Sequence, residues 1–182
     1  LPFRQDISKR AFKNEGPARC IDAMSPQVQA GTSFPAADPG FAALPVAELL
    51  ASAEDLVARI RLCFGIDRDS FDSDVQPLLR RYAAYVHLLP ATADNYFSAP
   101  GGLLRLGLEV AFFSLQGTDA HIFSGRSTIS ARRQLEPRWR QATFIGGLCC
   151  ELHRVLSHTI VTDAGGDEWP AYLQPLADWL GT

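Results

Sequence analysis

The tripeptide Pro100-Gly101-Gly102 constrains the fold of this chain more than any other feature of its sequence. It stands between two apolar stretches, one ending at Pro90 and the other beginning at Leu103. A proline fits the first position of a helix, where its missing N–H would have no partner. Adjacent glycines let the backbone approach another helix or a ligand closely. The sequence therefore predicts a tight corner between two helices, with His87 just before it.

Apolar residues recur elsewhere at three- and four-residue steps, the spacing of an amphipathic helix. This spacing predicts helices over residues 45–64, 75–89, 101–117, 136–155 and 172–180. Residues 67–74 form a polar connector in this prediction. β-Branched residues over 159–162 and turn residues over 164–167 predict a small hairpin. Residues 1–44, rich in Pro, Gly, Ala and Ser, are typical of an extended or poorly ordered N-terminal arm. The predicted fold class is mostly α, a helical domain over 45–182 with a small C-terminal β-hairpin.

Composition and charge limit the classes of function. A chain of 182 residues suits one domain. Its formal net charge of −3 exerts no overall attraction on nucleic acid, so any DNA site must arise from local patterning. No apolar run approaches the ~20 residues of a membrane span, which excludes an integral membrane protein. The four cysteines form no CxxC motif, which favours reduced thiols in a cytoplasmic protein.

One local pattern is strongly basic. Five arginines fall within fifteen residues, with Glu136 the only acid among them: Arg126, Arg132, Arg133, Arg138 and Arg140. Such a cluster predicts contacts with DNA phosphates, which weaken as salt rises. The candidates for DNA binding are Arg105, Arg132, Arg133, Arg138 and Arg140, with Arg105 joining the others if the helices pack as expected. The alternative is a solvated helix face, or arginines that pair with Glu109 and Glu136.

Several motifs in a fixed order carry a resemblance to a known family. They are His87-Leu-Leu-Pro-Ala, Pro100-Gly-Gly-Leu-Leu-Arg, Leu108-Glu-Val-Ala, Glu136-Pro-Arg-Trp-Arg, Gly147-Leu and Pro175-Leu-Ala-Asp-Trp-Leu. From about Leu44 to Leu180 the chain resembles the N-terminal domain of MobH-class conjugative relaxases, TraI-like proteins of plasmids and integrating conjugative elements. The resemblance implies an HD-hydrolase-like helical fold, a role in conjugation, and DNA and relaxosome proteins as partners.

The resemblance also implies a metal centre, from which this sequence departs. It implies an HD-type metal-dependent phosphohydrolase core, with a His after the Gly-Gly-Leu-Leu-Arg run and a His-Asp pair in a later helix. Those positions carry Leu106, Cys150 and Glu151 here, with Arg154 as the basic residue beyond them. Leucine cannot ligate a metal, and a thiolate suits zinc or iron better than magnesium or manganese. We therefore expect a lost HD centre, no cofactor and no activity as a metal hydrolase.

The predicted function is a relaxase domain that binds DNA or a relaxosome partner during horizontal transfer, without a membrane partner. One alternative is an active metal-dependent nuclease or phosphohydrolase with altered ligands around Cys150, Glu151 and His153. Cys150 and His153 lie three residues apart, on one face of a helix, and could share a metal. The other alternative is a non-catalytic structural or interaction module.

The corner supplies a second group of candidate site residues, which are His87, Gly101, Gly102, Glu109 and His153. His87 could face a site at the corner, or its ring nitrogens could bond to the loop backbone, as polar groups at buried helix ends require. Glu109 is the only acid of its helix and should point at solvent, a partner or a site.

Overall fold

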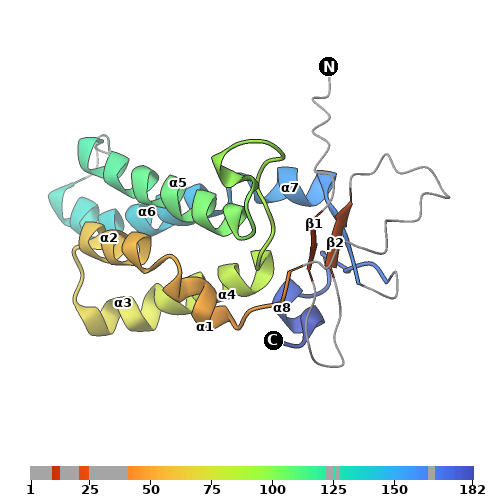
Figure 1. Cartoon of the computed structure of the whole chain (residues 1–182). Helices are drawn as coiled ribbons and strands as arrows, with labels where there is room; N and C mark the ends of the chain where they lie inside the picture. Colours follow the sequence, from red (N-terminus) through yellow and green to blue (C-terminus); the bar gives the residue numbers. More distant parts are fainter. Residues whose placement is uncertain (1–9, 13–20, 25–40, 122–124, 126–127, 164–166) are drawn as a thin grey trace, which may run out of the picture.

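The computed structural model describes residues 10–12, 21–24, 41–121, 125, 128–163 and 167–182. The described chain is mostly helical, as the sequence predicts, and a small antiparallel sheet lies at one end of the helices (Figure 1). The least exposed side chains of the core come from helices that are distant in sequence: Ile60, Phe71, Leu79, Leu103, Leu108, Leu115, Phe144 and Leu148. None of the described helices combines the length and apolarity needed to cross a membrane.

The first predicted helix is divided into two. Helix α1 spans Val46–Ala51 and helix α2 spans Glu54–Phe64. Ser52 stands at the break and donates its hydroxyl to the carbonyl oxygen of Leu49 at 2.7 Å. Serine competes with the helical backbone for hydrogen bonds in this way. Gly65 adopts φ +64° and ends α2, at the stop that the sequence predicts.

The predicted polar connector is wrong, because residues Arg68–Asp74 form helix α3. The Asp67 carboxylate caps it by accepting a hydrogen bond from the Ser70 amide at 2.9 Å. Phe71 is buried and anchors the helix to the core. Helix α4, Gln76–Val86, follows after one residue and carries Pro77 in its first turn, as predicted. A short polar segment thus becomes helical because it has both a cap and one buried aromatic residue.

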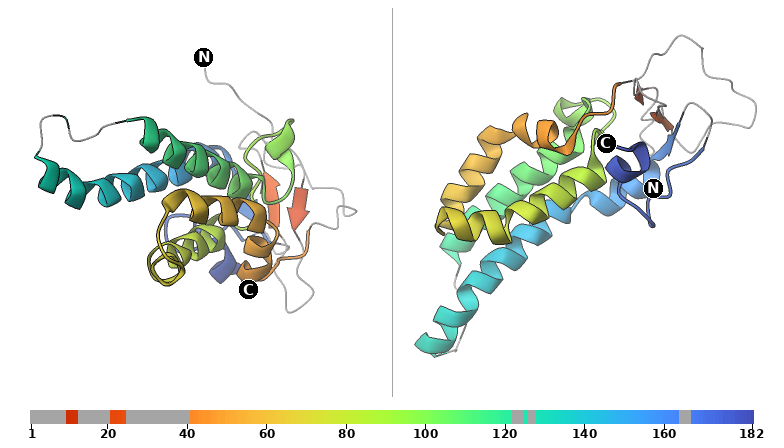
Figure 2. Two further views of the ribbon diagram at one scale, coloured as in Figure 1. Left: turned by 90° about the vertical axis from the view of Figure 1, so that its left-hand side faces the viewer. Right: turned by 90° about the horizontal axis from the view of Figure 1, so that it is seen from below.

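The two longest helices lie side by side and antiparallel (Figures 1 and 2). Helix α5 spans Gly102–Gly117, as predicted, and a short turn η2, Thr118–Ala120, follows it. Helix α6 spans Ile129–Cys149 and begins seven residues before the predicted start at 136. Thr128 caps it by accepting from the Ala131 amide at 3.3 Å, and Pro137 lies inside the helix. The N-terminal half of α6 projects beyond the other helices (Figure 2).

The C-terminal part combines a short helix, the predicted hairpin and a final helix. Helix α7, Leu152–His158, leads into strand β3, Ile160–Thr162, and Thr162 forms an antiparallel bridge with Glu168. The hairpin is therefore confirmed. Helix α8, Leu176–Leu180, ends the chain and begins four residues later than predicted.

The sheet has two further strands, which the sequence pattern does not predict. Strand β1, Arg10–Phe12, pairs with strand β2, Ile21–Met24, and β2 pairs with β3, all antiparallel. Both strands come from the predicted N-terminal arm, whose other residues up to position 40 lie outside the described chain.

Candidate functional site

The Pro-Gly-Gly corner brings a loop and a helix into backbone contact. Gly101 adopts φ +77°, and its amide donates to the carbonyl oxygen of Leu88 at 2.9 Å. A Cβ built on Gly102 would lie 2.7 Å from the carbonyl carbon of Phe97, in the turn η1, Tyr96–Ser98. Any side chain at position 102 would therefore displace the loop. The close approach that the glycines permit is to the protein's own backbone.

Backbone amides at the start of α5, which could otherwise bind a ligand, donate hydrogen bonds within the protein. The Gly102 amide donates to the Ala99 carbonyl and the Leu103 amide to the Leu89 carbonyl, each at 2.9 Å. Beside the corner lies an apolar cleft of about 430 Å³, which Gly101 borders together with apolar residues and Arg105. The corner thus forms one wall of that cleft. The amides of Gly101, Gly102 and Leu103 already donate to carbonyl oxygens of the protein, so they do not form an anion site.

His87 lies against this corner and is fully buried. Its backbone has φ +44°, and its Nε2 donates to the carbonyl oxygen of Leu44 at 2.9 Å. A carbonyl only accepts, so Nε2 carries the proton and Nδ1 is left without a partner in the described structure. Burial lowers the pKa of His87 below its ordinary 6.5, and the hydrogen bond to Leu44 opposes this shift. This geometry matches the alternative in which His87 bonds to loop backbone and ties residue 44 to the corner.

Helices α5 and α6 cross at two glycines. A Cβ on Gly107 would lie 2.7 Å from Cζ of Tyr82 and 3.0 Å from the carbonyl oxygen of Leu148. A Cβ on Gly147 would lie 2.6 Å from Oγ of Ser114. The buried Tyr82 hydroxyl donates to the Leu103 carbonyl at 3.2 Å. The tyrosine from α4 therefore packs against the crossing of α5 and α6.

The residues at those metal positions do not form a suitable donor set. Leu106 is half-buried and packs against the core, Cys150 is exposed, and Glu151 is half-buried where α6 gives way to α7. Burial, and then the Cys149 and Cys150 thiols, raise the pKa of Tyr82. Across the described ranges no three His, Cys, Asp or Glu side chains gather as metal ligands. A leucine, a thiol and one carboxylate do not fit magnesium or manganese.

The structure does not gather the remaining corner candidates into one site. Glu109 accepts a hydrogen bond from Nε of Arg105 at 3.1 Å, and Nη2 of Arg105 lies 3.6 Å from the Asp55 carboxylate. Arg105 also lies over the ring of Tyr96. His153 is exposed on α7, whereas His87 is buried and bonds to Leu44.

The predicted DNA-binding arginines separate into two groups. Arg105 and Arg140 are held by other groups of the protein, whereas Arg132, Arg133 and Arg138 are exposed on α6. Nε of Arg132 lies 4.0 Å from the Glu136 carboxylate, at the limit of an ion pair. Arg126 and the side chain of Arg154 lie outside the described residues.

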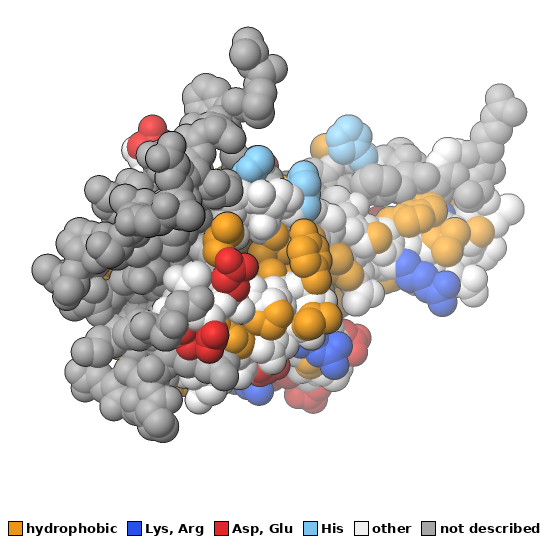
Figure 3. Space-filling view, turned by 90° about the vertical axis from the view of Figure 1, so that its right-hand side faces the viewer, with side chains coloured by type: hydrophobic (Ala, Val, Ile, Leu, Met, Phe, Trp, Pro, Cys, Tyr) orange, Lys and Arg blue, Asp and Glu red, His pale blue; other side chains and the backbone are white. Residues whose placement is uncertain are grey.

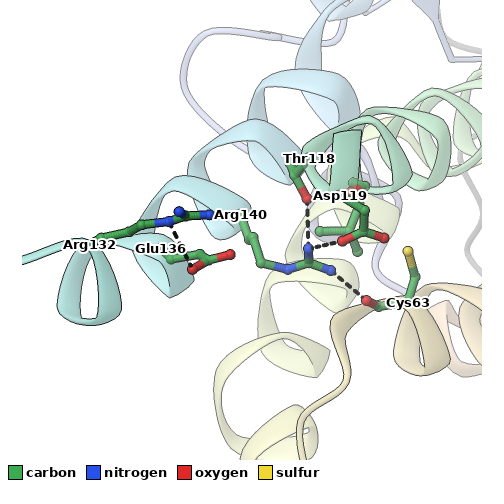
Figure 4. Close-up of polar contacts among 7 residues, drawn as sticks. Cys63, Thr118, Asp119, Arg132, Glu136 and Arg140 are labelled. Atoms are coloured by element: carbon green, nitrogen blue, oxygen red, sulfur yellow. Dashed lines mark hydrogen bonds and ion pairs between the residues drawn. The ribbon is translucent and has the colours of Figure 1, made fainter. Parts of the chain in front are cut away.

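Arg140 joins three helices, as Figure 4 shows. Its guanidinium donates to Oγ1 of Thr118 at 2.8 Å and to the carbonyl oxygen of Cys63 at 2.6 Å, and it also pairs with Asp119. The Arg140 side chain is 18% exposed. The end of α2, the end of α5 and the middle of α6 therefore meet at one cation, which gives Arg140 a structural role.

Comparison with known families identifies the chain. Residues 40–182 match the model of the TraI_2 family, which is described as "Putative helicase". The chain belongs to the TraI_2 family. No curated protein and no solved structure gave a significant match. The TraI-like character predicted for this domain is confirmed, while its MobH class and its HD ancestry stay predictions.

The TraI_2 chain also has a basic cleft that sequence reasoning missed. Arg61 from α2, Arg68 from α3 and Arg80 from α4 border a cleft of about 440 Å³. No local spacing rule relates three residues that stand on three different helices, so only the packing of the helices brings them together.

Proposed function

We propose that this TraI_2 chain is a DNA-contacting domain of a MobH-class conjugative relaxase. In this proposal it acts in the cytoplasm during horizontal DNA transfer, together with relaxosome proteins. Family membership and the motif resemblance support the conjugative setting. One observation carries the DNA contact: Arg132, Arg133 and Arg138 are exposed on the half of α6 that projects from the bundle.

The arrangement of these arginines favours a helix surrounded by phosphates. An α-helix turns about 100° per residue, so Arg133 and Arg138 stand about 140° apart, with Arg132 on the remaining arc about 100–120° from each. The three arginines are therefore spread around the helix, with Glu136 beside Arg132 and with Arg133 bordering a cleft that Asp74 also lines. A helix in the major groove has phosphates on both walls, and the groove is wide enough to admit it. On the face seen in Figure 3, the visible described side chains include acidic and basic groups among hydrophobic ones.

We also propose that the domain descends from an HD-type hydrolase and has lost its metal centre. The donor set of Leu106, Cys150 and Glu151 supports this, because it offers one thiol and one carboxylate where a cation needs several hard ligands. Elemental analysis of the purified protein tests the proposal. One equivalent of metal that is lost on substitution of Cys150 or Glu151 would favour the nuclease alternative.

Salt-dependent DNA binding tests the main proposal. The variant R132Q/R133Q/R138Q removes the three exposed charges of α6, and binding to a fluorescent DNA duplex and to the corresponding single strand is measured by anisotropy across a salt series. If each arginine contacts one phosphate, the slope of log K against log salt for the duplex falls by about 2.7. Affinity falls for all duplex sequences alike, because phosphate contacts carry no base information.

Two control variants make the result specific. R81Q removes one exposed charge from α4, outside the projecting helix, and should leave the slope unchanged. E136Q removes the acid that lies beside Arg132 and should strengthen binding. An unchanged slope in the triple variant, or an equal loss in R81Q, would refute a role for α6 in DNA contact.

A further inference from the structure

The cleft between α2, α3 and α4 has the chemistry of an anion site. Three arginines border it, one from each helix, and two acids, Glu54 and Asp72, reduce its formal charge to +1. Nε of Arg68 lies 3.7 Å from the Asp72 carboxylate, so these two charges largely offset each other. The remaining charges are two arginines and one glutamate.

Arg61 and Arg80 are the cations that remain available. Among the described residues neither has a carboxylate within ion-pair distance. Arg61 is half-buried near the end of α2, whereas Arg80 is exposed on α4. Two guanidinium groups held on different helices can bind one anionic group from two sides, each with paired N–H donors.

The walls of the cleft hold these arginines on a rigid support. Phe71 is 1% exposed and Val57 is 7% exposed, and both border the cleft as part of the core. The first turn of α4, with Gln76 and Pro77, forms another part of the wall.

We propose that this cleft binds phosphate groups, either of a free polyphosphate-bearing ligand or of a nucleic-acid backbone. A volume of about 440 Å³ exceeds that of a single phosphate and accommodates a chain of several. An arginine fork pairs two N–H donors with two oxygen atoms of one phosphate group, which a spherical halide ion cannot offer. The cleft uses none of the α6 arginines, so this proposal stands apart from the proposed function.

Titration of the whole chain with inorganic tripolyphosphate by calorimetry at low salt tests the proposal. We expect saturable binding of one equivalent. R61Q/R80Q should weaken it about tenfold or more, because each variant position removes a charged hydrogen-bond donor. The matched control R81Q changes the adjacent arginine of α4, which does not border the cleft, and should stay within about twofold of the unchanged protein.

A gain-of-binding variant separates charge from folding. D72N removes the carboxylate that lies beside Arg68 and should strengthen tripolyphosphate binding several-fold, which misfolding cannot produce. The same variants are then titrated with duplex DNA. A parallel loss in R61Q/R80Q assigns the site to a nucleic-acid backbone, whereas unchanged DNA binding assigns it to a free ligand. Absence of saturable tripolyphosphate binding, or an equal loss in R81Q, would overturn the proposal.

Discussion

The adjacent glycines of α6 should respond to alanine substitution with opposite signs. A Cβ on Gly146 would have no neighbouring atom within 4 Å, whereas a Cβ on Gly147 would lie 2.6 Å from Oγ of Ser114 and 3.0 Å from Cα of Ala111. Both glycines lie in the same helix, one residue apart. Both substitutions gain the helix propensity of alanine, but only the one at Gly147 disturbs the packing of α6 on α5. A comparison of the two variants therefore separates these two effects.

The magnitudes follow from these two effects. Alanine in place of a helical glycine stabilises by about 0.5–1 kcal/mol, which is the whole effect for G146A. At Gly147 the added methyl group overlaps a serine side chain and a backbone carbon, and such overpacking costs about 1–3 kcal/mol. We expect G147A to be less stable than G146A by that amount. For a chain of this size, each kcal/mol shifts the Tm by about 2–4 °C.

Thermal unfolding followed by circular dichroism measures both variants against the unchanged protein. G146A should raise the Tm by a few degrees, and G147A should lie below G146A by about 2–12 °C. The variant G147A/S114A provides a further control, because removal of the Ser114 hydroxyl makes room for part of the new methyl group. Equal Tm values for G146A and G147A would refute the close crossing of α5 and α6.

Three other substitutions test single features of the fold. R140A should lower the free energy of unfolding by about 3 kcal/mol, because it removes charged hydrogen bonds to the ends of α2 and α5, while the exposed R138A should change it by less than about 0.5 kcal/mol in a urea titration. G102A should cost at least about 3 kcal/mol, because its Cβ would overlap the backbone of Phe97, and a soluble protein of unchanged Tm would contradict this. Burial holds the pKa of His87 below 6.5 in the folded state, so the unfolded state binds the proton more readily and the free energy of unfolding should fall as the pH drops below 6.5. H87N should lower this slope in urea titrations from pH 7.5 to 5, and an identical slope would refute it.

The sequence by itself determined the features that depend on neighbouring residues. The apolar spacing of α5, the stop at Gly65, the proline in the first turn of α4 and the terminal hairpin were all predicted, because each depends on local backbone preferences. The motif order also predicted the TraI-like character that the family match confirms. The sequence predicted that the backbone at the Pro-Gly-Gly corner approaches another group closely. It did not predict whether that group is a helix, a ligand or, as the structure has it, the loop at Phe97.

Local reasoning failed where a long-range contact outweighs local preference. The segment Arg68–Asp74 is polar, yet burial of Phe71 makes it a helix. Pro137 is a strong signal for a helix start, yet α6 begins at Ile129, where Thr128 provides a cap and α5 provides a surface to pack against. Strands β1 and β2 carry little pattern of their own, and β2 pairs with β3, which is far from it in the sequence.

The roles of the arginines were decided by tertiary structure alone. In the sequence Arg138 and Arg140 are equivalent members of one basic cluster. In the folded chain Arg138 is exposed, whereas Arg140 lies where the ends of α2 and α5 meet α6 and donates to oxygen atoms at both ends. Arg61 and Arg80 are nineteen residues apart and belong to no motif, yet two helices bring them to one cleft. The role of an arginine depends on which groups of other helices lie next to it in the folded chain. The spacing of residues within one helix does not contain that information.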